Sequence, residues 1–187
     1  MSYLFGIDEL REKLMILSVL SLSGEEFCKR YKMGSVQYQK VYTSAEYTKI
    51  TKLITSNYLV EISVKLRNLV DSLNSLGFEL EIEGKIRIYN SGACADCISR
   101  DKSFRFICNK IIHAESFNLD FIGSKKYHKD MVWWSGNVTV SGTYQTKYWE
   151  FFFSVADWCD EIVKFLDKSE NQISSMQNSS RDIQIHG

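Results

Sequence analysis

The spacing of apolar residues predicts helices in the first third of the chain. In residues 7–22, leucines recur every three or four positions, which places them on one face of a helix. Ser23 and Glu26 then have the spacing of a capping box. We therefore expect a second, short helix to begin at Ser23 and to end near Gly34.

The longest apolar repeat follows a second capping box, formed by Thr43 and Glu46, and runs to Gly77. Its apolar positions are Ile50, Ile54, Tyr58, Ile62, Leu66, Leu69, Leu73 and Leu76. A helix of this length would extend about 50 Å and could form the spine of a bundle. A last helical face covers residues 155–168, whereas residues 169–187 have no apolar period and predict a mobile tail.

Between the long helix and the last one, the apolar period changes to two, which is typical of strands. Residues 78–82 and 86–88 alternate apolar with charged side chains and predict a hairpin. A three-residue loop over residues 83–85 places Ile82 opposite Ile86, so we favour it over a two-residue loop.

A second hairpin is predicted over residues 132–140 and 147–153, which are rich in aromatic and β-branched residues. Its turn lies either at Ser141 and Gly142 or around Gln145. These patterns predict an α+β fold, in which a bundle of three or four helices carries two antiparallel hairpins that form a small sheet. Residues 1–168 form a single globular domain, and 169–187 form a flexible C-terminal tail.

The composition restricts the classes of function. The 187 residues carry 23 basic and 23 acidic side chains, so the chain has no general attraction to nucleic acid or to anionic membranes. The apolar stretch 14–22 is about half as long as a membrane span, and acidic residues precede it where a signal peptide has basic ones. We therefore expect no membrane association and a cytoplasmic location.

Cys94 and Cys97 form a C-x-x-C pair in the predicted loop 90–99. A structural zinc site needs four ligands, and Cys108 and His113 are about 140° apart on a predicted helix, so they cannot easily share one metal. Ordinary thiols, a metal site with unidentified ligands and a redox pair remain open. We expect no metal and no other cofactor.

The most informative segment is a predicted helix over residues 101–115. It contains Asn109 and His113 separated by three residues, and Arg105 stands one turn before Asn109. This pattern resembles the signature of HEPN-type domains, small helical proteins of toxin, antitoxin and phage-defence modules. Their active members carry an Arg, a polar residue that is often Asn, three further residues and a His. Cys108 occupies the position at which that family has its Arg.

The resemblance implies a metal-independent endoribonuclease that assembles as a dimer, with His113 in acid–base transfer at the RNA 2′-hydroxyl and an arginine on the phosphate. Arg105, Asn109 and His113 are the candidate catalytic residues, and their spacing places them on one helical stripe about 12 Å long. A structural interpretation stays open, in which Asn109 and His113 tie the helix to the neighbouring strands.

Two classes of function follow. The first is a HEPN-like accessory or defence-type protein of prokaryotic or mobile-element origin, with RNA as its partner. The second is a non-enzymatic protein-interaction module that uses the aromatic β-segment 133–153. A basic run at 125–129 could steer phosphate, although such runs are commonly only solvated. For either class we expect a homodimer, because exposed aromatic surface is normally covered by a partner.

Overall fold

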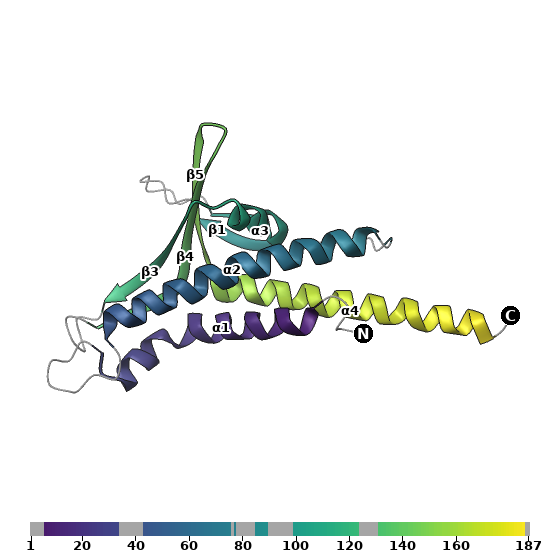
Figure 1. The fold of residues 1–187 in the computed structure, drawn as a ribbon, viewed down its shortest axis with the longest axis horizontal. Coiled ribbons are helices and arrows are strands. Elements are labelled where there is room, and N and C mark those ends of the chain that lie inside the picture. The colour runs from purple at the N-terminus through teal and green to yellow at the C-terminus, as the bar shows by residue number, and fades with distance from the viewer. Residues whose placement is uncertain are drawn as a thin grey trace.

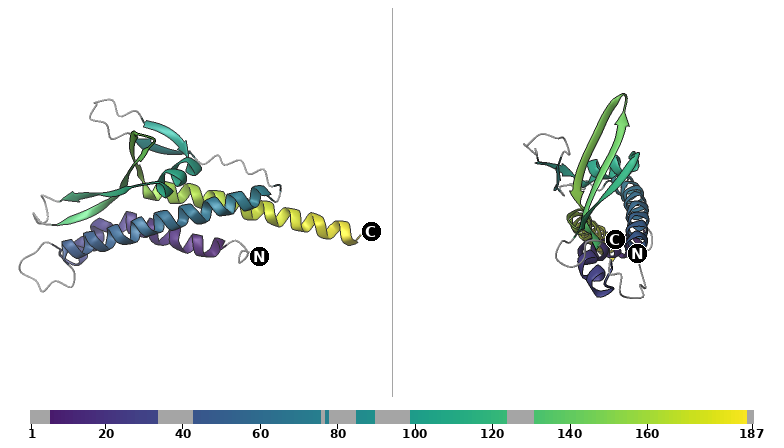
Figure 2. Two further views of the ribbon diagram at one scale, coloured as in Figure 1. Left: turned by 45° about the horizontal axis from the view of Figure 1, so that its top comes forward. Right: turned by 90° about the vertical axis from the view of Figure 1, so that its left-hand side faces the viewer.

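The protein is an α+β fold, as the sequence predicts. A computed structural model describes residues 6–33, 43–75, 77, 85–89, 99–123 and 131–185, and for residues 99–100 and 176–185 it describes the backbone only. Three long helices, α1, α2 and α4, lie on one side of a five-stranded antiparallel sheet, and the short helix α3 packs beside α2 (Figures 1 and 2).

Helix α1 (Ile7–Arg30) is continuous through the point where a second helix is expected. The prediction of a break at Ser23 is wrong, because a buried face that includes Leu17, Gly24 and Cys28 extends across it. Gly24 is needed there. A Cβ at this position would lie 2.8 Å from both the Trp134 carbonyl oxygen and the Tyr47 hydroxyl.

Helix α2 (Ser44–Ser75) begins where its capping box predicts. The Thr43 hydroxyl accepts a hydrogen bond from the Glu46 amide at 3.1 Å, and the Glu46 carboxylate accepts one from the Thr43 amide at 2.8 Å. The second half of α2 buries Leu66, Leu69 and Leu73 of the predicted set, whereas Leu76 lies outside the described residues. In the first half the buried positions are Tyr47, Thr51 and Thr55, so the expected assignment of Ile50 to the core is wrong.

The sheet has the strand order β2-β1-β5-β4-β3. Its strands are β1 (Lys85–Tyr89), β2 (Ser99–Ser103), β3 (Ser116–Gly123), β4 (Val132–Tyr144) and β5 (Lys147–Ser154). The hairpin of β4 and β5 is confirmed, and its turn lies at Gln145 and Thr146, both with positive φ. The tip of this hairpin projects away from the helices (Figure 1).

The other predicted hairpin falls only in part within the described residues. Strand β1 pairs along its whole length with β2, from Lys85 opposite Ser103 to Tyr89 opposite Ser99. The expected partner strand, 78–82, lies outside the described residues. Strand β2 is an edge strand with the polar sequence SRDKS, which carries no apolar alternation that could have revealed it.

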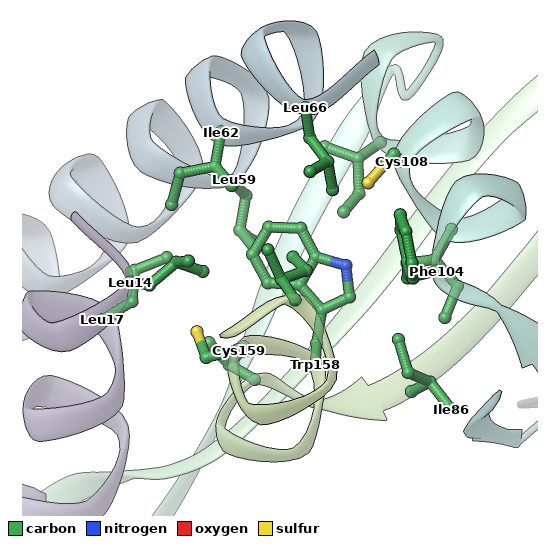
Figure 3. Packing of buried hydrophobic residues seen from close by; sticks show 14 of the residues in the cluster. Leu14, Leu17, Leu59, Ile62, Leu66, Ile86, Phe104, Cys108, Trp158 and Cys159 are labelled. Carbon is green, nitrogen blue, oxygen red and sulfur yellow. The ribbon is translucent and has the colours of Figure 1, made fainter. Parts of the chain in front are cut away.

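One core joins the helices to the inner face of the sheet. Trp158 of helix α4 (Val155–Ile185) is fully buried at its centre, between Leu59 and Leu66 of α2 and Phe104 of α3 (Figure 3). Ile86 of β1 and Val140 of β4 belong to the same cluster.

Helix α4 continues well beyond Lys168, where the sequence predicts its end. Ser169 is buried and its hydroxyl donates to the Phe165 carbonyl, while Ile173 packs against the core. The more distal part of α4 projects past the body of the molecule (Figure 1). The prediction that the helix stops near residue 168 is therefore wrong, since its backbone is helical to Ile185.

Candidate functional site

Helix α3 (Phe104–Ile112) carries the candidate residues and is shorter than the expected 101–115. It begins where the Ser103 side chain accepts a hydrogen bond from the Phe106 amide at 3.3 Å. Its strongly amphipathic sequence buries Phe104, Ile107 and Ile111 against the core. The opposite side of the helix is therefore fixed toward solvent.

All three candidate residues lie on that outer side. Arg105, Asn109 and His113 are exposed, with His113 as the C-terminal capping residue just beyond the last helical turn. An Arg105 guanidinium nitrogen lies 3.5 Å from a carboxylate oxygen of Asp71 on α2. The structural interpretation has Asn109 and His113 tie the helix to the neighbouring strands, and both residues are exposed.

Cys108, at the position of the HEPN arginine, faces the other way. Its side chain is buried in the core beside Trp158 (Figure 3). Burial raises the pKa of the Cys108 thiol to about 12, so the thiol is neutral at physiological pH. This position therefore supplies no positive charge to the outer side of α3.

The outer side of α3 combines positive charge with partly exposed aromatic rings. The Lys110 ammonium lies 4.3 Å from the ring centre of Trp149 on β5, and the Lys102 ammonium lies 5.2 Å from that of Phe106. At such distances a cation is attracted to the ring face. We call this region the α3 surface; it comprises Lys102, Arg105, Phe106, Asn109, Lys110, His113 and Trp149.

Gly142 of β4 brings the projecting hairpin into this surface. A Cβ on Gly142 would lie 2.7 Å from the Trp149 ring and 3.1 Å from the His113 carbonyl oxygen. The glycine thus lets the indole ring lie across β4 and lets the end of α3 approach the strand. Trp149 and His113 are consequently held at the same end of the sheet.

The acidic side chains at this end are turned toward the other face of the sheet. The Glu115 carboxylate accepts from the Thr143 amide at 3.0 Å, and the Tyr148 hydroxyl donates to the Glu150 carboxylate at 2.6 Å. The pair of Thr143 and Tyr148 is one position along the strands from the pair of Gly142 and Trp149. Because successive side chains alternate between the two faces of a sheet, Thr143 and Tyr148 point away from α3. Asp71 is an acidic residue that does contact the α3 surface directly, through Arg105.

The aromatic β-segment contributes more to the core than to the surface. Trp134, Phe151 and Phe153 are buried, and the Trp134 indole N–H donates to the Asn137 carbonyl at 2.7 Å. Tyr144 and Tyr148 at the hairpin tip are exposed. Part of the aromatic β-segment therefore belongs to the core, and exposed rings lie at its hairpin tip.

Other sequence candidates fall outside the described residues: the Cys94 and Cys97 pair and the basic run 125–129. Among the residues that the structure does describe, no group of His, Cys, Asp or Glu side chains is arranged to hold a metal ion. In the same part of the chain, no helix is long and apolar enough to span a membrane. Cys28 and Cys159 are buried thiols like Cys108.

Sequence reasoning missed Lys102, Phe106 and Lys110 as parts of one surface. Phe106 and Lys110 are four residues apart, so their proximity on a helix could have been inferred. Lys102 precedes the helix on β2 and is also four residues from Phe106, so the expected helix over 101–115 would have brought these two together as well. Comparison of the chain with protein-family models, with curated proteins and with solved structures finds no match.

Proposed function

We propose that the protein binds single-stranded RNA through the α3 surface and does not cleave it, as an accessory member of a defence or mobile-element system. The observation that carries the proposal is the shared exposure of Arg105, Asn109 and His113 beside Lys110 and Trp149. Such a surface offers positive charge to phosphates, amide and imidazole groups for hydrogen bonds, and rings for base stacking.

Cleavage of RNA would need a positive charge in a defined place beside His113. A metal-independent ribonuclease must stabilise the negative charge that develops on phosphorus. The position before Asn109 holds a neutral, buried thiol, and Arg105 is engaged with Asp71 one turn earlier. His113 therefore has no arginine beside it in the arrangement that the HEPN resemblance implies. We expect the protein to bind RNA without cleaving it.

Fluorescence anisotropy with a labelled oligouridine tests the binding. We expect Arg105→Ala and Lys110→Ala each to weaken affinity about 5- to 10-fold, with unchanged melting temperature, because exposed cations contribute little to folding. Lys164→Ala, which removes an exposed lysine of α4 that pairs with Glu161, is the control for the loss of a charge and should bind like the wild type. With three cations involved, the logarithm of affinity should fall with the logarithm of salt concentration with a slope of about −2.

Cleavage is tested on the same RNA with a chelator present. We expect it to remain intact during prolonged incubation with the wild type. Loss of full-length RNA that His113→Ala abolishes would show that the protein is an enzyme. Equal affinities of the wild type, the Arg105 variant and the Lys110 variant would show that the α3 surface does not bind RNA.

A further inference from the structure

Among the described residues, the largest group of exposed apolar side chains lies on α1 and α2. Met15, Val19 and Leu22 on α1 are 64%, 58% and 75% exposed, and Leu53 on α2 is 58% exposed. Residues of this kind would normally lie inside a protein, and a contiguous group of them marks an interaction site. The two helices together form what we call the α1–α2 face.

The exposed residues follow a pattern that packs helices together. On α1 the spacing from Met15 to Val19 to Leu22 is four and then three, which is the repeat of a coiled-coil seam. On α2 the outer positions Leu53 and Val64 lie on one stripe, eleven residues apart. The exposed side chains of each helix thus form a ridge, which could pack into the groove between two helices of a partner.

A groove separates the two ridges. It has a volume of about 320 Å³ and is lined mainly by apolar side chains, among them Leu20, Phe27 and Ile50. Elsewhere along the two helices, Lys13 and Lys65 each contact Glu9 and Glu61 in ion pairs. The groove has room for side chains from a facing helix.

We propose that two copies of this chain associate through the α1–α2 face, stacking their helix pairs into a four-helix arrangement across a two-fold axis. The inference is independent of RNA binding. The face contains both ridges and a groove, so it can serve as its own partner, as a two-fold interface requires.

The charges along α1 favour a second copy in the antiparallel orientation. The first turns of α1 expose Asp8 and Glu12, whereas Arg30 is exposed at its other end. A two-fold axis perpendicular to α1 brings the acidic end of one copy to the basic end of the other.

The size of the face also suits a dimer. A helix of the 24 residues of α1 is about 36 Å long, and two packed helices are about 18 Å wide, which gives a face of roughly 650 Å². Stable interfaces bury about 800 Å² per partner, so a dimer through this face also has to bury side chains along its rim.

Light scattering coupled to size exclusion tests the proposal. At 100 µM we expect a mass of twice 21.7 kDa for the wild type and 21.7 kDa for Val19→Glu and Leu22→Glu. Both side chains are exposed in the single chain, so the variants should retain the wild-type circular dichroism spectrum. Tyr148→Glu, at 65% exposure on the hairpin tip, is the matched control and should remain a dimer.

Two results would overturn the proposal. A wild type of 21.7 kDa at 100 µM would show that the face does not join two copies of this chain. A dimer that survives Val19→Glu and Leu22→Glu but dissociates with Tyr148→Glu would place the contact on the β4–β5 hairpin instead.

Discussion

At the scale of single residues, Gly24 shows how packing overrides local preference. Glycine is a poor helix former, and the sequence around it suggests a break between two helices. The close approach of β4 and of the Tyr47 hydroxyl leaves no room for a side chain there. The glycine therefore allows α1 to stay continuous and to contact the sheet.

Replacement of Gly24 distinguishes the effect of helix propensity from the effect of packing against β4 and Tyr47. Helix propensity alone predicts that Gly24→Ala stabilises the protein by about 1 kcal/mol. Two contacts at 2.8 Å predict instead an overpacking cost of about 1–3 kcal/mol, and we expect the melting temperature to fall by about 5 °C.

Gly123→Ala is the control for this substitution. Its Cβ would meet only the Met131 carbonyl, at 4.0 Å, so its melting temperature should stay close to that of the wild type. A Gly24→Ala variant that melts above the wild type would contradict the account of the α1–β4 contact.

Residue patterns predicted the candidate site only in part. The i, i+4, i+8 spacing correctly placed Arg105, Asn109 and His113 on one side of α3. It could not show that Trp149 lies beside Lys110, because that contact joins a helix to a strand about forty residues later and depends on the space at Gly142.

At the scale of elements, capping boxes are informative only where no core continues through them. Thr43 and Glu46 form the reciprocal hydrogen bonds that begin α2, whereas Ser23 and Glu26 lie inside α1. Strand β3 was missed although Phe117, Leu119 and Phe121 alternate with polar residues, which is a strand signal. Strand β2 carries no such signal, since its sequence SRDKS contains no apolar residue.

The length of α4 gives a prediction about truncation. Removing residues 176–187 should change the melting temperature by less than about 2 °C, because the chain left behind keeps Ser169 and Ile173 in place. Ending the chain after Lys168 should lower it by about 4 °C, since this also removes the packing of Ile173 and the ion pair between Glu170 and Arg11. Thermal unfolding of the two truncated proteins makes the comparison. Equal melting temperatures would show that residues 169–175 contribute nothing to the fold.

The ion pairs between α1 and α2 predict a dependence on pH. Hydrogen bonds and attraction from Lys65 and Lys13 lower the pKa of Glu9 from its ordinary 4.5 to about 2. A carboxyl group with a lowered pKa in the folded state contributes stability above pH 4.5 and loses it as the pH falls toward 2.

Glu9→Gln should therefore melt below the wild type at pH 6, and the difference should shrink steadily between pH 4.5 and pH 2.5. Glu12→Gln, which changes an exposed carboxylate of the same helix outside the ion-pair cluster, controls for the loss of a charge. A Glu9→Gln difference as large at pH 2.5 as at pH 6 would show that the carboxylate is not held by the two lysines.

At the scale of the whole molecule, the fold separates two surfaces. The α1–α2 face is apolar and lies on the helical layer, whereas the α3 surface is cationic and lies where the projecting hairpin meets the helices (Figure 1). A dimer formed through the first would leave the second on the outside of each copy. The net charge of zero hides this division, because the positive groups are gathered locally.

RNA bound as we propose contacts the α3 surface. Photo-crosslinking an oligouridine that contains 4-thiouridine, followed by mass spectrometry of the digested protein, locates the contact directly. We predict crosslinks within residues 102–113 and at Trp149, reduced in Lys110→Ala and unchanged in Lys164→Ala. Crosslinks confined to α1, α2 or the distal part of α4, or none at concentrations that saturate binding, would contradict the account.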